Sequence, residues 1–299
     1  MPIIPPLGIL PLADRGILSI TGDDRKSFLQ GLISNDTSRL TAGRALYASL
    51  LTAQGKYLHD FFLVERGDAI LLDGEAERLD DLKRRLSLYR LRAKVAIENV
   101  SAAFDVLAYF GDNAASAFNL DGEPGSQTVT GSTIAYVDPR LSALGLRLIA
   151  TKSEAPAVLS RHKAGSMEDY ERLRIGLGVP DGSRDMVVEK SILLENGFDE
   201  LHGVDWKKGC YIGQELTART KYRGLIKKRL MPVSIEGPTP AAGSLIHIGD
   251  EEVGEMRSGV SGLGLAVLRL EAVDRVAAGE TLRSGDAVLH PAKPAWALF

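Results

Sequence analysis

The 299-residue sequence contains one cysteine and only five histidines. One thiol cannot form an intrachain disulfide, which excludes a disulfide-stabilised scaffold. It also cannot supply a structural zinc site unless histidines complete the ligand set. No two histidines are three or four residues apart, so the sequence lacks a helical metal-binding pair. We therefore expect no resident metal site.

Long apolar runs are also missing, and no stretch approaches the roughly 18 residues of a membrane-spanning helix. The N-terminal residues carry no basic segment, and prolines interrupt their apolar run, which is not typical of a secretory signal. We therefore expect a cytoplasmic protein with no membrane partner. Hydrophobic residues form 44% of the chain and charged residues 25%, a composition typical of a globular protein.

The glycine-rich signatures of nucleotide-binding loops are absent, and the net charge of −3 argues against a general nucleic-acid coat. One basic segment at 83–94, KRRLSLYRLRAK, includes Tyr89. An arginine beside an aromatic ring can stack on a base. Such a segment is more often the solvated end of a helix, so we do not expect nucleic acid as a direct partner.

Short apolar segments separated by glycine and proline predict many small elements. Their order mixes strands and helices without strict alternation, which favours an α+β region over residues 1–229. The short strands expected in residues 230–299 are typical of a small β-barrel. In the first region we expect strands at 17–20, 46–51, 57–64, 69–72, 95–97, 106–109, 133–137 and 144–150, and helices after Asp23 or Asp24 and at 75–88, 114–118 and 167–177. In the second region we expect strands at 231–235, 244–248, 252–256, 263–270 and 287–290.

One segment, from Lys207 to Arg229, has eight Lys or Arg residues and a single acid, Glu215. This local excess of positive charge indicates either a solvated basic face or a site for an anion. The anion would be a nucleic acid, the tail of a polyanionic cofactor or an acidic protein.

The sole cysteine, Cys210, lies in this basic segment, directly before a helical pattern. A helix N-terminus and neighbouring cations both lower the pKa of a thiol, which favours a reactive cysteine. Cysteine is also a common small buried side chain, so the residues alone leave both interpretations open. Gly209 and Gly213 would let the backbone approach a ligand or a packed strand closely.

The segment KGCYIGQE resembles the signature of the YgfZ family, the folate-binding relatives of the glycine-cleavage T protein. Its continuation, LTART followed by Gly224 and KRL, is most similar to the branch of iron–sulfur cluster assembly factors. The segments at 28–36 and 51–64 extend the resemblance over most of the chain. The signature positions are Lys208, Gly209, Cys210, Tyr211, Gly213, Gln214 and Glu215.

The resemblance implies ferredoxin-like α+β halves around a central funnel, followed by a C-terminal β-barrel. It implies tetrahydrofolate, or a one-carbon derivative, as cofactor. The implied function is a tetrahydrofolate-binding accessory protein that assembles or repairs [4Fe–4S] clusters and supports Fe–S-dependent tRNA modification. Cys210 would be its working thiol. Clusters usually take four thiolates, so an assembly or recipient protein, or a second copy, would share the cluster.

The resemblance also implies site residues. Asp60 falls where the T protein keeps its catalytic acid beside folate, and His59 replaces a second Asp. Tyr47, Asp73 and Glu195 align with folate contacts, Glu195 with the glutamate that holds the pterin. A carboxylate can accept both N–H donors of a pterin edge, and burial in an apolar strand would raise the pKa of Asp60. The other expected cofactor contacts are Lys208, Gly209, Tyr211, Gly213, Gln214, Glu215, Arg219 and Arg223, the two arginines receiving the anionic tail.

Other functions remain open. A folate-dependent aminomethyltransferase, which transfers a one-carbon unit, is the alternative that Asp60 favours. The replacement of the second Asp by His59 and the cysteine signature favour the assembly factor. An RNA-binding module is a third hypothesis, which the near-neutral net charge disfavours. Asp60 and Glu195 also have ordinary interpretations as solvent-facing acids.

Overall fold

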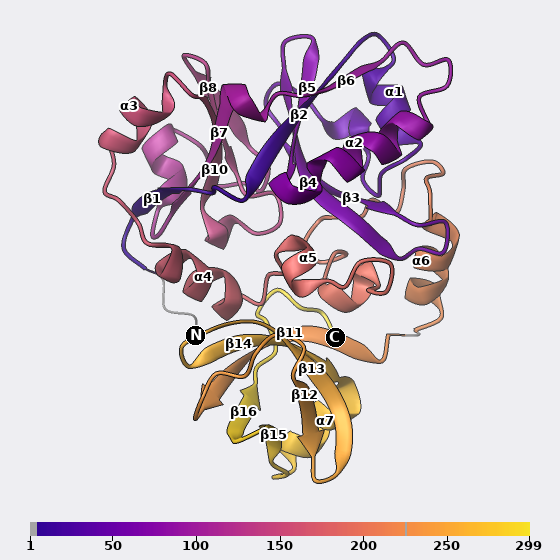
Figure 1. Cartoon of the computed structure of the whole chain (residues 1–299), viewed down its shortest axis with the longest axis vertical. Helices are drawn as coiled ribbons and strands as arrows, with labels where there is room; N and C mark the ends of the chain where they lie inside the picture. The colour runs from indigo at the N-terminus through magenta and orange to yellow at the C-terminus, as the bar shows by residue number, and fades with distance from the viewer. Residues whose placement is uncertain (1–4, 225) are drawn as a thin grey trace.

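The computed structural model describes residues 5–224 and 226–299. Two five-stranded antiparallel sheets form the larger part of the molecule, and a closed six-stranded barrel follows at the C-terminal end (Figure 1). The predicted α+β architecture with a C-terminal β-barrel is therefore confirmed.

The first sheet contains the strands predicted at 46–51 and 57–64, joined by a turn in which Gly55 has a φ of +70°. Its outer face packs on two helices, α1 and α2, and its inner face meets the second sheet. Phe61 and Leu63 point outward while Phe62 and Val64 point inward, which explains why the whole run is apolar. In spatial order the strands are β3 (Leu46–Leu51), β4 (Tyr57–Arg66), β5 (Ala69–Glu75), β2 (Arg15–Thr21) and β6 (Ala96–Asn99). The helices are α1 (Arg25–Gln30) and α2 (Leu79–Leu88).

The second sheet packs its inner face against the first and its outer face against the short helix α3 (Ala155–Ser160). Its two edge strands, β1 and β8, have no counterpart among the predicted strands. In spatial order the strands are β1 (Gly8–Pro11), β7 (Phe104–Phe110), β10 (Leu146–Thr151), β9 (Thr133–Val137) and β8 (Gln127–Thr130).

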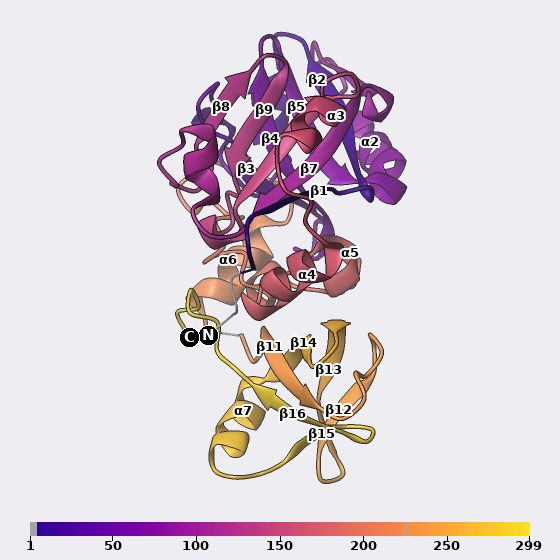
Figure 2. The same cartoon turned by 90° about the vertical axis from the view of Figure 1, so that its left-hand side faces the viewer.

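The barrel lies below the two sheets, and helices α4 (Met167–Gly176) and α5 (Gly182–Asp185) lie between them in both views (Figures 1 and 2). A division of the chain at residues 229 and 230 would fall inside the first barrel strand, and it stays a prediction. The strands are β11 (Lys228–Glu236), β14 (Leu263–Arg269), β13 (Glu251–Val260), β12 (Leu245–Ile248), β15 (Leu282–Ser284) and β16 (Ala287–Pro291).

Two predicted helices and one predicted strand form differently from the expectation. The helix expected at 75–88 begins at Leu79, because Glu75 still belongs to β5 and a 3-10 turn intervenes. The segment at 114–118 forms a 3-10 helix. The strand expected to end at Leu270 ends one residue earlier, and helix α7 (Leu270–Ala277) follows it against the barrel.

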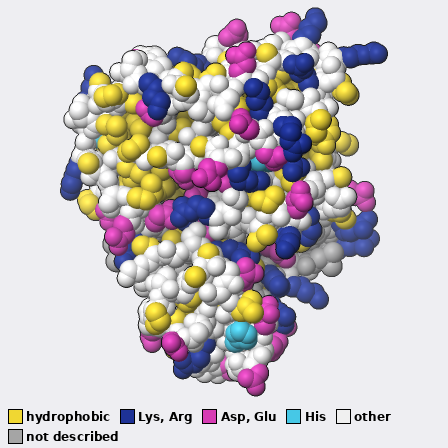
Figure 3. All heavy atoms as spheres, viewed as in Figure 1, with side chains coloured by type: hydrophobic (Ala, Val, Ile, Leu, Met, Phe, Trp, Pro, Cys, Tyr) yellow, Lys and Arg dark blue, Asp and Glu magenta, His cyan; other side chains and the backbone are white. Residues whose placement is uncertain are grey.

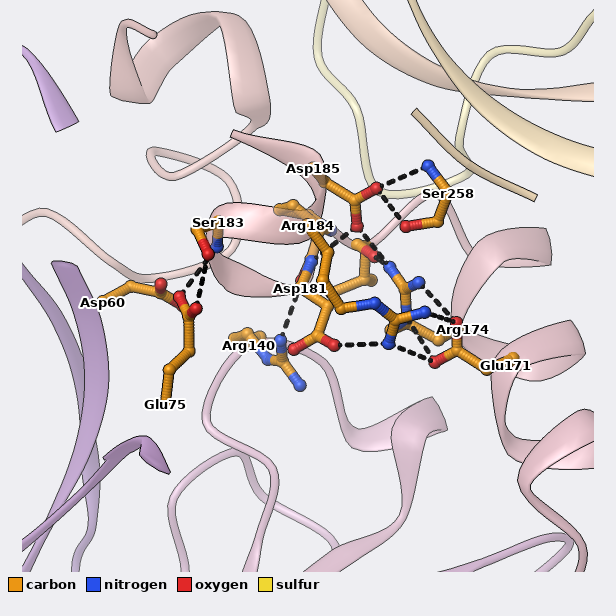
Figure 4. A network of polar contacts seen from close by, with 12 residues as sticks. Asp60, Glu75, Arg140, Glu171, Arg174, Asp181, Ser183, Arg184, Asp185 and Ser258 are labelled. Atoms are coloured by element: carbon orange, nitrogen blue, oxygen red, sulfur yellow. Dashed lines mark hydrogen bonds and ion pairs between the residues drawn. The ribbon is translucent and has the colours of Figure 1, made fainter. Parts of the chain in front are cut away.

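A buried carboxylate, Asp185, connects the helices below the sheets to the barrel. Arg174 of α4 donates to Asp185 of α5 at 2.6 Å, and both side chains are almost fully buried. The second oxygen of Asp185 accepts from the amide of Ser258 in β13 at 2.9 Å and from its hydroxyl. Figure 4 shows this group, with Glu171 on the other side of Arg174. One carboxylate therefore holds α4, α5 and the barrel together.

We predict that Asp185→Ala lowers the free energy of unfolding by about 3 kcal/mol, because it leaves a buried arginine short of a partner and two Ser258 donors without an acceptor. Urea unfolding of the full chain measures this change. Asp274→Ala removes an exposed acid of α7 and is the matched control, expected within about 0.5 kcal/mol of the parent. Equal midpoints for the two variants would contradict the prediction.

Candidate functional site

Asp60 lies in β4 with 3% of its surface exposed. The hydroxyls of Tyr47 and Tyr57 each donate to one of its oxygens at 2.8 Å. Burial and the charge of Glu75 raise the pKa of this carboxyl, against the opposing effect of Arg15 and the two phenols. The group is an acid whose affinity for a proton is increased, which suits acid–base work.

A β-bulge brings Tyr57 onto the face of Asp60. Residues three apart in a regular strand point to opposite faces. Here Leu50 pairs with His59 and Leu51 with Tyr57, so Leu58 is an extra residue in β4. The sequence pattern gave no sign of this irregularity, and Tyr57 was not predicted as a site residue.

Tyr57 also links Asp60 to the helices above the barrel. Its hydroxyl lies 3.2 Å from Glu75, whose carboxylate accepts from the amide and the hydroxyl of Ser183 in α5 at 2.7 and 2.5 Å. In Figure 4 the side chains of Asp60 and Glu75 lie next to each other beside Ser183. The position of Asp60 is thus coupled to the packing of α5.

Asp73, predicted as a folate contact, is fully buried between two arginines. One oxygen accepts from Arg15 and the other from Arg147, both at 2.7 Å. Burial alone would raise the pKa of this carboxyl, but the charges of Arg147 and Arg15 hold it below its usual value. Both oxygens are therefore engaged within the protein.

Three arginines fill the space between the sheets around Phe62. The guanidinium carbon lies 4.1 Å from the ring centroid for Arg147, 4.9 Å for Arg140 and 5.7 Å for Arg15. Such contacts are favourable for a cation removed from water. Sequence analysis identified none of these arginines, since Phe62 and the Asp73 partner of Arg15 and Arg147 are distant from them along the chain.

A cavity of about 180 Å³ opens at the edge of this packed interior, beside Tyr47. Two arginines, Arg39 and Arg44, line it together with Glu123 and His202. The guanidinium of Arg39 donates to the carboxylate of Asp205 at 3.2 Å. The cavity is therefore lined by two guanidinium groups and by Tyr47, the residue that donates to Asp60.

Glu195 lies in the 3-10 turn Leu193–Asn196 and is half-buried. Burial raises the pKa of its carboxyl, and the charges that oppose this rise are Lys56, Lys228 and Arg229. These cations are separate from the groups that act on Asp60 and Asp73. The structure brings Tyr47 and Asp60 together but does not add Glu195 to that cluster.

Cys210 is exposed, in a loop that precedes helix α6 (Gln214–Tyr222). The prediction that the thiol lies at the helix N-terminus is wrong, because α6 begins four residues later. Gly213 precedes the helix with a φ of +82°, and a Cβ there would lie 2.6 Å from the carbonyl oxygen of Thr52. Only glycine fits this position without strain. At Gly209, by contrast, a Cβ would meet open space.

The other signature residues are divided between the base of the loop and the surface. Lys208 and Tyr211 are buried, with the Lys208 ammonium 5.0 Å from the Tyr211 ring centroid. Burial raises the pKa of Tyr211 to about 12. Gln214 is the first residue of α6 and is half-buried, and Glu215 is exposed.

The arginines expected to receive the folate tail lie on the surface. Arg219 pairs with Glu215 at 3.0 Å, one helical turn away, and Arg223 is exposed at the end of α6. Lys and Arg side chains gather along this side of the molecule, at the right-hand edge of Figure 3. The structure does not place either arginine in the group around Asp60 and Tyr47.

Two further findings concern the described residues as a whole. No helix within 5–224 and 226–299 is long and apolar enough to cross a membrane. In the same ranges, no three His, Cys, Asp or Glu side chains are arranged to hold a metal ion.

We predict that Gly213→Ala lowers the free energy of unfolding by about 1–3 kcal/mol, because it forces an alanine into the left-handed region and against Thr52. Gly209→Ala, four residues away in open space, is the control and should unfold like the parent. Thermal unfolding followed by circular dichroism compares the two. If both variants melt alike, the close approach at Gly213 does not constrain the loop.

Comparison with known proteins gives the following relatives. Residues 227–299 match the family model described as CAF17, C-terminal beta-barrel domain. The chain is 33% identical over 287 residues to the mouse protein named iron-sulfur cluster assembly factor IBA57, mitochondrial, covering 88% of this chain and 77% of that protein. It is 34% identical over 281 residues to the human protein of the same name, with the same two coverages.

The crystal structure of the glycine cleavage system aminomethyltransferase T from Bartonella henselae superposes with a TM-score of 0.75 at 14% identity, over 97% of this chain and 85% of that one. The expected T-protein-like fold is therefore confirmed. The prediction of a cytoplasmic protein is contradicted, because the mouse and human relatives are both named as mitochondrial. Given the identity and coverage of these relatives, the chain belongs to the family of IBA57 iron–sulfur cluster assembly factors.

Proposed function

We propose that the protein assembles or repairs [4Fe–4S] clusters, binds tetrahydrofolate or a one-carbon derivative, and uses Cys210 as its working thiol. The observation that carries this proposal is the exposed thiol of Cys210, in a loop between the buried Lys208 and the closely packed Gly213. Fe–S-dependent tRNA modification would depend on the same activity. The YgfZ-like cysteine signature, KGCYIGQE, forms this loop and the start of α6.

The single thiol sets how the protein would act on a cluster. Clusters are usually held by four thiolates, and this chain has one cysteine. The other ligands must therefore come from an assembly protein, a recipient protein or a second copy. Exposure of Cys210 gives such a partner access, and the exposed basic side chains of Lys207 and Arg223 favour a partner with an acidic surface.

Two separate groups of side chains support tetrahydrofolate as the cofactor. Glu195 offers a half-buried carboxylate, raised in pKa by burial, for the N–H donors of a pterin edge. Arg39 and Arg44 offer guanidinium groups for the carboxylates of the tail, beside Tyr47. When bound, the cofactor would supply a carrier for a one-carbon unit.

The available space limits how the cofactor would bind. The cavity beside Tyr47 holds about 180 Å³, less than the roughly 300–1,000 Å³ of a typical ligand site. It is large enough for part of the ligand only. The segments around Tyr47 would have to move to admit the rest, and Asp60 would be reached only if Tyr47 or Tyr57 turned away from its carboxylate.

Asp60 is the one observation that favours the alternative, an aminomethyltransferase. Its pKa is raised and two phenols orient it, so it is equipped to hold or release a proton at a carboxylate oxygen. Turnover of an aminomethyl-lipoyl carrier protein by the purified chain would establish that activity. We favour the assembly factor because the family relatives carry that name.

We predict that Cys210→Ala fails to restore the activity of [4Fe–4S] enzymes in a strain that lacks this gene, while the purified variant binds tetrahydrofolate like the parent. The thiol is exposed and forms no disulfide, so the fold should be unchanged. Enzyme activity in extracts measures the first effect, and calorimetric titration measures the second.

Cys210→Ser, which keeps the size of the side chain, is the matched variant and should fail in the same way. Full restoration by either variant would show that the thiol is dispensable. Absence of saturable tetrahydrofolate binding by the parent would remove the folate part of the proposal and leave the role of the thiol to the first assay.

A further inference from the structure

Lys208 is the buried lysine at the base of the Cys210 loop, with 7% of its surface exposed. Its Nζ donates to three backbone carbonyl oxygens, those of Gln30 at 2.8 Å, Ile33 at 2.6 Å and Asn35 at 2.7 Å. An ammonium has three N–H donors, so this geometry uses all of them. Gln30 is the last residue of α1, where carbonyls lack helical partners and carry partial negative charge.

The same loop is attached by further bonds on the N-terminal side of Lys208. The carboxylate of Asp205 accepts from the amides of Lys207 and Lys208 at 2.7 and 2.9 Å, and the amide of Asp205 donates to Ser34 at 3.0 Å. The next connection is Asn35, whose side chain donates to the carbonyl of His202 at 2.8 Å. The segment before Cys210 is therefore held along the turn that follows α1.

Beyond Cys210 the chain is fixed again, where Gly213 packs against Thr52 and Gly55. The exposed thiol thus lies two residues after one anchor and three residues before another. Neither anchor uses the side chain of Cys210, so the loop can be rigid while its sulfur stays accessible.

We propose that Lys208 is a positioning residue, which clamps the Cys210 loop to the carbonyl oxygens at the end of α1 and contacts neither cofactor nor cluster. The proposal rests on the proposed function for the use of the thiol, and on the three hydrogen bonds alone for the clamp. It replaces the expectation from resemblance that Lys208 contacts folate, since no N–H of its ammonium is left to donate.

Arginine would not reproduce the clamp. Its planar guanidinium directs five N–H groups outward in one plane, whereas these three carbonyl oxygens converge on one nitrogen. Lys207, the adjacent residue, is exposed and bears the same charge. Comparing a substitution of Lys208 with the same substitution of Lys207 therefore separates the effect of the clamp from the effect of local charge.

The single cysteine allows a direct test, because a nitroxide spin label attached to the full chain reacts at Cys210 alone. We expect Lys208→Met to increase the motional rate of the label several-fold in the electron paramagnetic resonance spectrum. Lys207→Met should leave the spectrum like that of the parent. Spectra are recorded well below the melting temperature of each variant, so a loss of global stability alone would not alter them.

Tetrahydrofolate titration of the unlabelled variants is the second readout, and Lys208→Met should bind like the parent. A label as immobile in Lys208→Met as in the parent would overturn the clamp. Loss of folate binding with an immobile label would also overturn it and would make Lys208 a ligand contact. If Lys208→Met does not fold, Lys208→Gln, which keeps an N–H donor, is measured against the same outcomes. A parent that binds no folate would contradict the folate proposal, while the spectra would still decide the clamp.

Discussion

The pairing of Asp73 with Arg147 and Arg15 is the interaction on which the rest of the structure depends. Asp73 lies on β5 of one sheet and Arg147 on β10 of the other, so a buried ion pair spans the interface between them. Separating the sheets would break the pair between Arg147 and Asp73 and leave Asp73 with Arg15 alone, and removing one partner of a buried ion pair is strongly unfavourable. The stacking of the arginines on Phe62 completes the filling of this space.

Because the space between the sheets is filled, a ligand can reach side chains only at its edge. Burial and the charge of Glu75 keep the pKa of Asp60 raised, and the remaining cavity beside Tyr47 is small. The exposed thiol of Cys210 lies on a loop clamped to the turn after α1, and Asn35 of that turn also lines the cavity. The cavity beside Tyr47 and the thiol loop therefore share one structural support.

The sequence predicted most strands and the relationship to iron–sulfur cluster assembly factors, but not these long-range contacts. The apolar runs at 46–51 and 57–64 are continuous and local, so these strands could be predicted from the sequence. The signature around Cys210 is local as well and could be recognised. The partners Asp73 and Arg147 are 74 residues apart. Lys208 binds backbone carbonyl oxygens, which every residue type has, so the sequence does not identify them. The start of α6 was misjudged because a left-handed Gly213 separates Cys210 from the helix.

Hydrogen–deuterium exchange of the full chain with and without tetrahydrofolate tests the central claim most directly. The claim is that ligand binds at the edge of a body whose sheets stay closed. We expect slower exchange in residues 35–47 and around Glu195 on adding tetrahydrofolate, and unchanged exchange in β5 and β10. Faster exchange in β5 and β10, or no protection anywhere in the chain, would contradict the account.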